Sequence, residues 1–518
     1  MYCHKCGTKN TDDAVFCYKC GSNLRGITSP SKKIIIFLIC LLIAVSIFIG
    51  KLPSWKGDPY GTLIVSQSII QNRTLNLNKV KRYWGINPVE YPHESYNYQV
   101  YRRDDNVYFS YPLGTSIISI PFVSIANTCG LNMLQHEKLM QEILASTVAI
   151  GIFLTIFIIS LEYFSFVYSI FIGLIGFYGT TVGTVVGTGL WDSDYELFFS
   201  GLSILLIFLY AKKNYKIYIK GIELSSVLTG LFFLLAFISR PTASILIFSI
   251  FVFLILYDKR YFFKGAIISG ILLMLYELVI YRYTGTLLGH IYESATTTST
   301  TARFSTTNFI TALEGFIWSP ARSVFIFNPF LLILPAGMYY IISKTHMHDR
   351  KIKYFILALL LSGVITSLFL LFWTDWYGGG SYGPRIFADA IYWYFLLTII
   401  VLGEITRFKI GPQKTMHTIF FSLMAIGVFI NIQGIYNRYA LEWNAYPNVD
   451  EYQNKVLFDW RYPQFLMTQK SLAEKCVTQG LEDRAVVSPN GWCEYCNLGI
   501  GGRTDYPINC TAWMRTNK

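Results

Sequence analysis

The chain has 518 residues, of which 53% are hydrophobic, 17% aromatic and only 14% charged, with a mean hydropathy of +0.41. Soluble globular proteins carry about 25% charged residues, so this composition excludes an ordinary soluble domain and predicts a membrane protein with many spans. The net charge of +12 does not indicate a nucleic-acid partner, because the basic residues recur in short clusters between apolar runs.

The N-terminal 25 residues contain two Cys-x-x-Cys-Gly turns, Cys3/Cys6 and Cys17/Cys20. Two such turns complete a tetrahedral set of thiolates, so we expect residues 1–25 to form a cytoplasmic zinc ribbon around one structural Zn²⁺. The alternative is two redox-active cysteine pairs or unpaired thiols. Disulfides are disfavoured in the reducing cytoplasm, which favours the zinc site. The module is similar to the zinc ribbons fused to many microbial membrane proteins. We expect it to support stability or to bind a cytoplasmic protein partner.

Apolar runs long enough to cross a bilayer follow the ribbon, at about 20 residues per span. They predict an all-α polytopic fold in a transmembrane domain over residues 34–433, which includes a long first outer loop at 51–138. Within that loop, residues 63–70 are expected to form a short amphipathic helix on the membrane surface, and residues 110–127 a surface or re-entrant helix. Eleven spans are predicted, near residues 34–50, 139–159, 166–188, 195–211, 223–238, 241–257, 265–283, 322–343, 353–372, 386–404 and 415–433.

Every second loop between these spans is basic, apart from the short one near 160–165, which places those loops in the cytoplasm. We therefore expect a multi-pass protein of the plasma membrane with a cytoplasmic N-terminus and an extracytoplasmic tail at 434–518. The tail contains four cysteines, for which two disulfides are favoured over a second metal site. They are Cys476, Cys493, Cys496 and Cys510.

Acidic residues gather in the outer loops. Asp58 lies between Gly57 and Pro59 just after the first span, and the stretch "GTGLWDSDYELFF" (187–199) holds Asp192, Asp194 and Glu196 without a nearby Lys or Arg. One interpretation is a solvated acidic loop. The other is a functional cavity in which the acids perform acid–base chemistry or bind a divalent cation.

Three arginines at outer span boundaries depart from the positive-inside bias: Arg240, Arg322 and Arg385. Each is interpreted either as an interfacial anchor or as a phosphate ligand, since a guanidinium matches phosphate oxygens. Arg385 is the strongest candidate, because the loop "FWTDWYGGGSYGPRIF" (372–387) places three glycines nearby, where a ligand can approach the backbone. The neighbouring aromatic residues form a membrane-interface belt or line a substrate site; the candidates are Trp376, Tyr377 and Tyr382, together with Tyr111.

These stretches resemble the GT-C glycosyltransferases, closest to the protein mannosyltransferase and aminoarabinose transferase branch. The matching motifs are "GDPYGTL", "YPLGTSIISIPF", "WDSDYELFF", "ISRPTA", "SPARSVFIFNPFLLILPAG" and "WYGGGSYGPR". The resemblance implies a catalytic Asp58, a second acidic site at Asp192 or Asp194, and Arg385 at the donor phosphate. It further implies transfer of a sugar from a polyprenyl-phosphate donor to a glycan, lipid or protein acceptor, with inversion. The zinc ribbon and the cysteine-bearing tail lie outside the family's core.

Two other functions remain as alternatives. A transporter or flippase for lipid-linked sugars predicts ionisable residues deep within spans and a two-fold internal repeat. The sequence has no clear repeat, and only Glu142 and Glu277 are expected inside spans. A non-catalytic membrane scaffold is the second alternative, and the joint presence of Asp58, Asp192/Asp194 and Arg385 argues against it.

Overall fold

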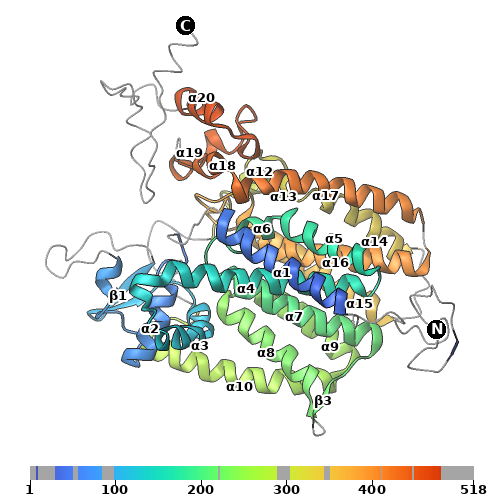
Figure 1. Ribbon diagram of the computed structural model, residues 1–518, viewed down its shortest axis with the longest axis horizontal. Coiled ribbons are helices and arrows are strands. Elements are labelled where there is room, and N and C mark those ends of the chain that lie inside the picture. Colours follow the sequence, from blue (N-terminus) through green and yellow to red (C-terminus); the bar gives the residue numbers. More distant parts are fainter. Residues whose placement is uncertain are drawn as a thin grey trace.

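The computed structural model is mostly helical, as the composition predicts (Figure 1). It describes residues 8–9, 30–50, 57–84, 99–219, 222–288, 304–343, 350–409, 411–445 and 448–479. The four zinc-ribbon cysteines and three cysteines of the tail lie outside the described residues, namely Cys3, Cys6, Cys17, Cys20, Cys493, Cys496 and Cys510.

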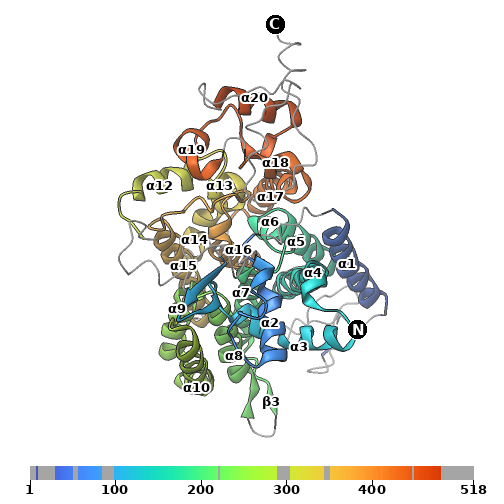
Figure 2. The ribbon, with the colours of Figure 1, turned by 90° about the vertical axis from the view of Figure 1, so that its left-hand side faces the viewer.

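Long apolar helices run roughly along the longest dimension of the molecule, and Figure 2 looks along them from one end. Among the described residues, six helices are long and apolar enough to cross a membrane. They are α4 (Met133–Leu161), α7 (Asp192–Lys213), α10 (Lys259–Thr284), α15 (Arg350–Leu370), α16 (Ala388–Phe408) with the preceding turn η3 (Arg385–Phe387), and α17 (Gln413–Tyr436). These helices indicate a membrane protein.

Other apolar helices pack among them: α1 (Pro30–Gly50), α5 (Phe166–Tyr178), α6 (Thr181–Val185), α8 (Leu224–Ser239), α9 (Ala243–Tyr257), α12 (Phe309–Trp318), α13 (Val324–Phe327), η2 (Pro329–Ile333) and α14 (Leu334–Ser343). Each predicted span overlaps at least one helix, but the number of eleven spans is not confirmed. The predicted spans 166–188 and 322–343 are both interrupted, at Gly179 and at Asn328–Pro329. The two interruptions meet, because the Asn328 side chain accepts a hydrogen bond from the Thr181 amide (2.8 Å) and donates one to its hydroxyl (2.9 Å). Polar backbone released by the breaks is thereby satisfied inside the bundle.

Helix α16 forms the centre of the bundle, and all of its residues from Ala388 to Ile405 are buried. Its aromatic rings lie against glycines of the surrounding helices: Phe395 contacts Gly176 of α5, and Tyr394 contacts Gly363 of α15. A larger residue at either glycine would collide with the ring. Small residues thus bring neighbouring helices close to α16, as they do in other membrane bundles.

One end of the bundle is covered by the segment expected as the first outer loop, seen at the left of Figure 1. It contains α2 (Thr62–Asn72), η1 (Lys81–Trp84), the antiparallel strands β1 (Val100–Arg103) and β2 (Asn106–Phe109), and α3 (Gly114–Thr128). Val100 pairs with Phe109 in the hairpin. Both helices predicted in this loop are present, but α2 is not the surface helix expected, because its first seven residues are buried where it packs against α3 and α4.

The predicted tail is also partly helical. Its elements are α18 (Arg438–Glu442), α19 (Val449–Val456), η4 (Gln464–Leu466) and α20 (Gln469–Gln479), which gather at the top of Figures 1 and 2. Toward the other end of the bundle, a short hairpin of β3 (Tyr218–Ile219) and β4 (Ile222–Glu223) joins α7 to α8.

Candidate functional site

A cavity of about 1250 Å³ lies where α7 and α16 begin and where α8 and α15 end. Separate segments of the chain line it, among them the turn before α2, the segment leading into α7, the α8–α9 junction, the end of α15 with the loop that follows, and α19. Polar residues on its wall include Asp58, Thr188, Asp192, Ser193, Arg240, Thr242, Asp375, Tyr377, Ser381, Arg385, Asp450 and Gln453.

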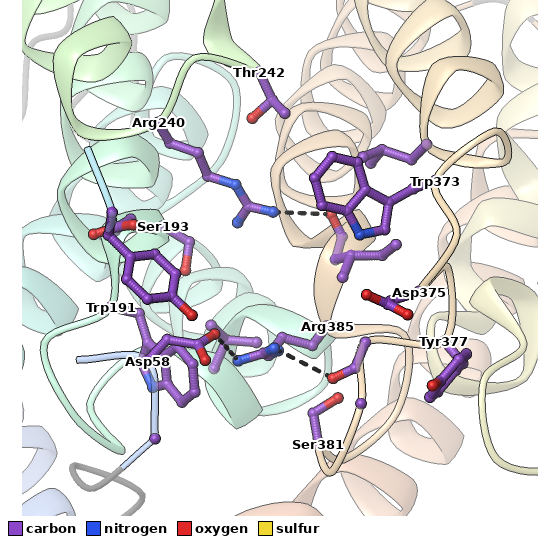
Figure 3. A pocket seen from close by; sticks show the side chains of 18 of the residues that line it. Asp58, Trp191, Ser193, Arg240, Thr242, Trp373, Asp375, Tyr377, Ser381 and Arg385 are labelled. Carbon is purple, nitrogen blue, oxygen red and sulfur yellow. Dashed lines mark hydrogen bonds and ion pairs between the residues drawn. The ribbon is translucent and has the colours of Figure 1, made fainter. Parts of the chain in front are cut away.

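Asp58 and Arg385 point toward one another across this cavity (Figure 3). Nη1 of Arg385 lies 3.0 Å from Oδ2 of Asp58, and its Nη2 donates a hydrogen bond to the carbonyl oxygen of Gly378 (3.2 Å). The guanidinium also lies over the Trp191 ring, 4.4 Å from its centroid. Both ionic side chains keep partial solvent access, at 21% and 29% exposed. The structure therefore brings together the two residues that the sequence placed at catalysis and at phosphate binding.

The glycine loop shapes the wall beside Arg385. Gly378, Gly379 and Gly383 have φ values of 77°, 60° and 61°, in the left-handed region that L-residues with side chains rarely occupy. The Gly378 amide closes a turn onto the carbonyl oxygen of Asp375 (2.8 Å). This conformation turns the Gly378 carbonyl toward Arg385, which explains why the sequence concentrates glycines at this point.

Arg322 has a different position from the other two arginines. Its side chain is 1% exposed and is not part of the cavity wall. It donates to the carbonyl oxygens of Tyr377 (2.5 Å) and Gly379 (3.0 Å), which belong to the glycine loop. Other donors reach Asn444 (2.7 Å) and Gln464 (2.8 Å) in the C-terminal helical segment. Its guanidinium thus ties the loop to that segment and does not face the cavity.

Arg240 lines the cavity, but its guanidinium is held by residues at the start of α16. Its Nη1 lies 3.2 Å from the carboxylate of Asp389, and its Nη2 donates to the carbonyl oxygen of Ile386 (3.3 Å). Thr242 donates to the second oxygen of Asp389 (2.8 Å). Asp389 is fully buried at the start of α16 and was not singled out in the sequence. The pair fixes the α8–α9 junction against α16.

The three acids at 192–196 separate because they lie on one helix. Asp192 opens α7, lines the cavity and accepts a hydrogen bond from the Thr115 hydroxyl (3.2 Å). Asp194 and Glu196 are fully buried and do not line the cavity. Asp194 points about 200° around the helix from Asp192, and Glu196 lies one turn deeper. Only the first acid of the predicted cluster shares the cavity with Asp58.

The predicted aromatic residues also divide. Tyr111, Tyr377 and Tyr382 line the cavity, whereas Trp376 does not; its ring packs against Gly315. Burial, together with the negative charges of Asp450 and Asp375, raises the pKa of Tyr377 above its usual range. Its phenol therefore stays protonated at neutral pH and remains a hydrogen-bond donor.

Sequence reasoning missed several residues on the wall. Trp191 stood inside a quoted motif without a role; its indole N–H donates to the Thr188 hydroxyl (2.9 Å), which fixes the ring beneath Arg385. Asp450 and Gln453 come from α19, in a region interpreted only as a tail. No motif in that region signals a site, because its contribution depends on how α19 packs over the glycine loop.

The other wall of the cavity is apolar and continues into exposed surface. Leu288, Phe304, Ile365 and Phe369 line it and are between 37% and 45% exposed. Phe304 and Phe369 lie in contact, with ring centroids 5.0 Å apart. The cavity thus joins a polar wall with charged groups to an apolar wall that reaches the molecular surface.

Comparison with known families identifies the N-terminal module. Residues 2–24 match the family model of a zinc-ribbon domain, which contains both predicted Cys-x-x-Cys turns. No curated protein matches the chain. In the part of the chain that the structure describes, no group of three or more His, Cys, Asp or Glu side chains is placed to hold a metal ion.

Proposed function

We propose that this protein is a membrane glycosyltransferase that moves a sugar from a polyprenyl-phosphate donor to an acceptor hydroxyl at the extracytoplasmic face. The ion pair between Asp58 and Arg385 on the cavity wall is the observation that supports it best. The Asp58 carboxylate is a base that can accept a hydroxyl proton, and the Arg385 guanidinium is a cation that suits a phosphate group.

The two walls of the cavity fit the two halves of such a donor. Arg385 is held from below by Trp191 and from the side by Gly378, so its guanidinium is fixed in the cavity wall. The exposed apolar wall formed with Phe304 and Phe369 suits an isoprenoid chain that enters from the bilayer. The resulting orientation puts the sugar–phosphate bond beside Asp58.

The proposed reaction is a direct displacement. Asp58 takes the proton of the acceptor hydroxyl while the acceptor oxygen forms a bond to the anomeric carbon. The bond between that carbon and the phosphate oxygen breaks, and the polyprenyl phosphate leaves with the electron pair. Arg385 stabilises the negative charge that grows on the leaving group. Attack from the opposite face inverts the anomeric configuration.

A divalent cation is not needed for this scheme. Asp58 and Asp192 are the acids of the predicted set that line the cavity, and the structure gives the first of them Arg385 as its counterion. Asp192 is suited to accept hydrogen bonds from sugar hydroxyls. No step is therefore assigned to a metal ion here.

At the N-terminus we propose that Cys3, Cys6, Cys17 and Cys20 bind one structural Zn²⁺ in the cytoplasm. The zinc-ribbon match over residues 2–24 supports this assignment. Four thiolates leave no open coordination position, so this module is proposed to bind a cytoplasmic protein or to stabilise the chain.

The test uses the purified full-length chain with a panel of polyprenyl-phosphate monosaccharides and glycan, lipid and peptide acceptors. The expected result is release of polyprenyl phosphate together with a glycosylated acceptor. Movement of the intact donor between leaflets of a vesicle, without release of polyprenyl phosphate, would show a flippase instead. Neither release nor movement with any donor would support the scaffold.

A further inference from the structure

Among the buried residues of helix α4 are one carboxylate and one carboxamide, Glu137 and Gln141, which lie one turn apart. Glu137 is 2% exposed and Gln141 is fully buried. Neither lines the cavity. A carboxylate and an amide enclosed in an apolar helical bundle are costly unless their hydrogen bonds are satisfied, so the partners of the two groups indicate what they do.

The carboxylate of Glu137 binds the start of α2. Its Oε1 accepts hydrogen bonds from the amides of Gly61 (3.0 Å) and Leu63 (3.1 Å), and its Oε2 accepts one from the Tyr83 hydroxyl (2.5 Å). The first amides of a helix have no partner within the helix, and a negative charge there is favourable. The residue before α2 is Gly61, which offers no side chain for this purpose. Glu137 supplies the missing cap from another helix.

Asp58 lies in the turn that leads into this capped helix. The turn is closed by hydrogen bonds from the Tyr60 amide to the Gly57 carbonyl and from the Thr62 amide to the Pro59 carbonyl, each 3.0 Å. Fixing the start of α2 therefore also fixes the backbone on which Asp58 is mounted.

Gln141 connects the turn that bears Asp58 to the segment before α7, whose Trp191 lies against Arg385. Its Nε2 donates to the carbonyl oxygen of Pro59 (2.9 Å), and its Oε1 accepts from the amide of Leu190 (3.1 Å). Pro59 follows Asp58 directly, and Leu190 precedes Trp191, on which Arg385 lies. A single side chain thus sets the separation between the segment that bears Asp58 and the segment that supports Arg385.

We infer that Glu137 and Gln141 are positioning residues, which hold the Asp58 turn and the Trp191–Asp192 segment in register on α4. Their catalytic consequence rests on the proposed function, whereas their structural consequence does not. Displacement of a reacting group by about 1 Å costs on the order of 100-fold in rate, so loosening this connection should lower kcat. Neither residue contacts Arg385 directly, and Gln141 acts on it only through the Leu190–Trp191 segment, so kcat should change by a larger factor than KM for the donor.

The experiment combines hydrogen–deuterium exchange with kinetics on the full-length protein. In Gln141→Met, we expect the Leu190 amide and the amides of 60–63 to exchange faster, and kcat to fall by about 10- to 100-fold. In Gln141→Glu, the acceptor for Leu190 remains while the donor to Pro59 is lost. Exchange should then increase in the 57–63 segment and stay slow at Leu190. Glu137→Gln, which keeps one acceptor oxygen, should be less impaired than Glu137→Ala.

Gln67→Met is the matched control. Gln67 is also buried (2% exposed) and also bridges α2 to the α4 end, through Asn132 (3.0 Å) and the Met133 amide (2.7 Å), but it does not contact the Asp58 turn. It should lower thermal stability comparably while keeping kcat. The inference is overturned if Gln141→Met leaves exchange at 57–63 and 190 unchanged. It is also overturned if Gln67→Met lowers kcat as much as Gln141→Met does. Absence of transfer by the wild type, with the exchange pattern as described, overturns the proposed function and supports the positioning role.

Discussion

Asp58 and Arg385 lie 327 residues apart in the sequence, and their side chains form an ion pair 3.0 Å long at the cavity. While this pair is intact, Asp58 occupies a hydrogen-bond donor of Arg385. A donor phosphate that binds Arg385 competes with Asp58 for it. Under the proposed function, binding of the donor would therefore release the base that the acceptor hydroxyl needs.

The first prediction concerns Asp58→Asn. The amide cannot take a proton, so transfer should fall by about 100- to 10,000-fold, the range for a lost general base. Polyprenyl phosphate should still bind, because Arg385 loses a competitor and keeps its other contacts. Release of polyprenyl phosphate and direct binding of polyprenyl phosphate are the two measurements.

Asp105→Asn is the control, since that carboxylate is 87% exposed in the β1–β2 turn. It should leave both quantities unchanged. Full transfer activity in Asp58→Asn would contradict the role of Asp58 as the base.

The second prediction concerns Arg385→Ala. Loss of charged hydrogen bonds to the phosphate should weaken binding of polyprenyl phosphate by about 1.5–3 kcal/mol, or about 10- to 150-fold. Arg385→Lys should restore only part of this affinity, because an ammonium cannot reproduce the planar contact with Trp191. Equilibrium binding to labelled polyprenyl phosphate measures the effect. Equal affinity in the alanine variant and in an exposed control, Arg102→Ala, would rule out the assignment.

The third prediction separates Arg322 from Arg385. Arg322→Met removes a buried guanidinium and leaves the Tyr377 carbonyl oxygen and the Asn444 side-chain oxygen without this donor, at a cost of about 1–3 kcal/mol for each buried acceptor. The expected result is a clear decrease in the thermal unfolding temperature, even before ligand is added. Arg461→Ala, at a side chain that is 70% exposed, should unfold at the wild-type temperature. An unfolding temperature of Arg322→Met equal to that of the wild type would show that the loop does not depend on this residue.

The fourth prediction concerns the glycine loop. Gly378→Ala forces a side chain into a left-handed conformation, at about 1–2 kcal/mol, and brings its Cβ to 3.0 Å from the Ser381 hydroxyl and 3.3 Å from Ile386. We expect reduced binding of polyprenyl phosphate together with reduced stability. Gly130 has a similar φ of +81° with open space around it, so Gly130→Ala carries the backbone strain without the contact. Stability should fall in both variants, and binding only in Gly378→Ala.

The fifth prediction concerns zinc. The full-length protein should contain about one zinc per chain, and a chain that begins at residue 26 should contain none. Polyprenyl phosphate release should be unchanged by the truncation, because the cavity is formed by residues from 57 onward. Elemental analysis of both proteins provides the comparison, and zinc that persists after truncation would refute the four-cysteine site.

The helices were predictable from sequence because hydrophobicity is a local property, and each predicted span overlaps at least one helix. The interruption at Asn328 was not, because it depends on a polar contact with Thr181 from a distant part of the chain. The same limit applies to the site. The sequence placed Arg322 and Arg385 at similar boundaries, and only tertiary contacts show that one lies inside the protein and the other on the cavity.

Helical register explains the remaining differences. The acids at 192–196 resembled one cluster because the sequence does not show at which residue α7 begins. Since α7 begins at Asp192, the side chain of Asp194 points away from the face that Asp192 occupies. Asp389 escaped notice because a single acid inside an apolar run gives no pattern, although it lies next to Arg240 in space.

The contacts of Arg322 also have a practical consequence for work with shortened proteins. Asn444 and Gln464 together receive two of its hydrogen bonds, and Gln464 additionally accepts from the Gly383 amide (3.1 Å). If the chain were cut after the last long helix, at residue 436, the buried Arg322 guanidinium would lose the acceptors Asn444 and Gln464 beside the cavity. A minimal version for crystallisation or cryo-microscopy should therefore keep the polypeptide at least through Leu466, and a fusion partner or affinity tag belongs beyond α20.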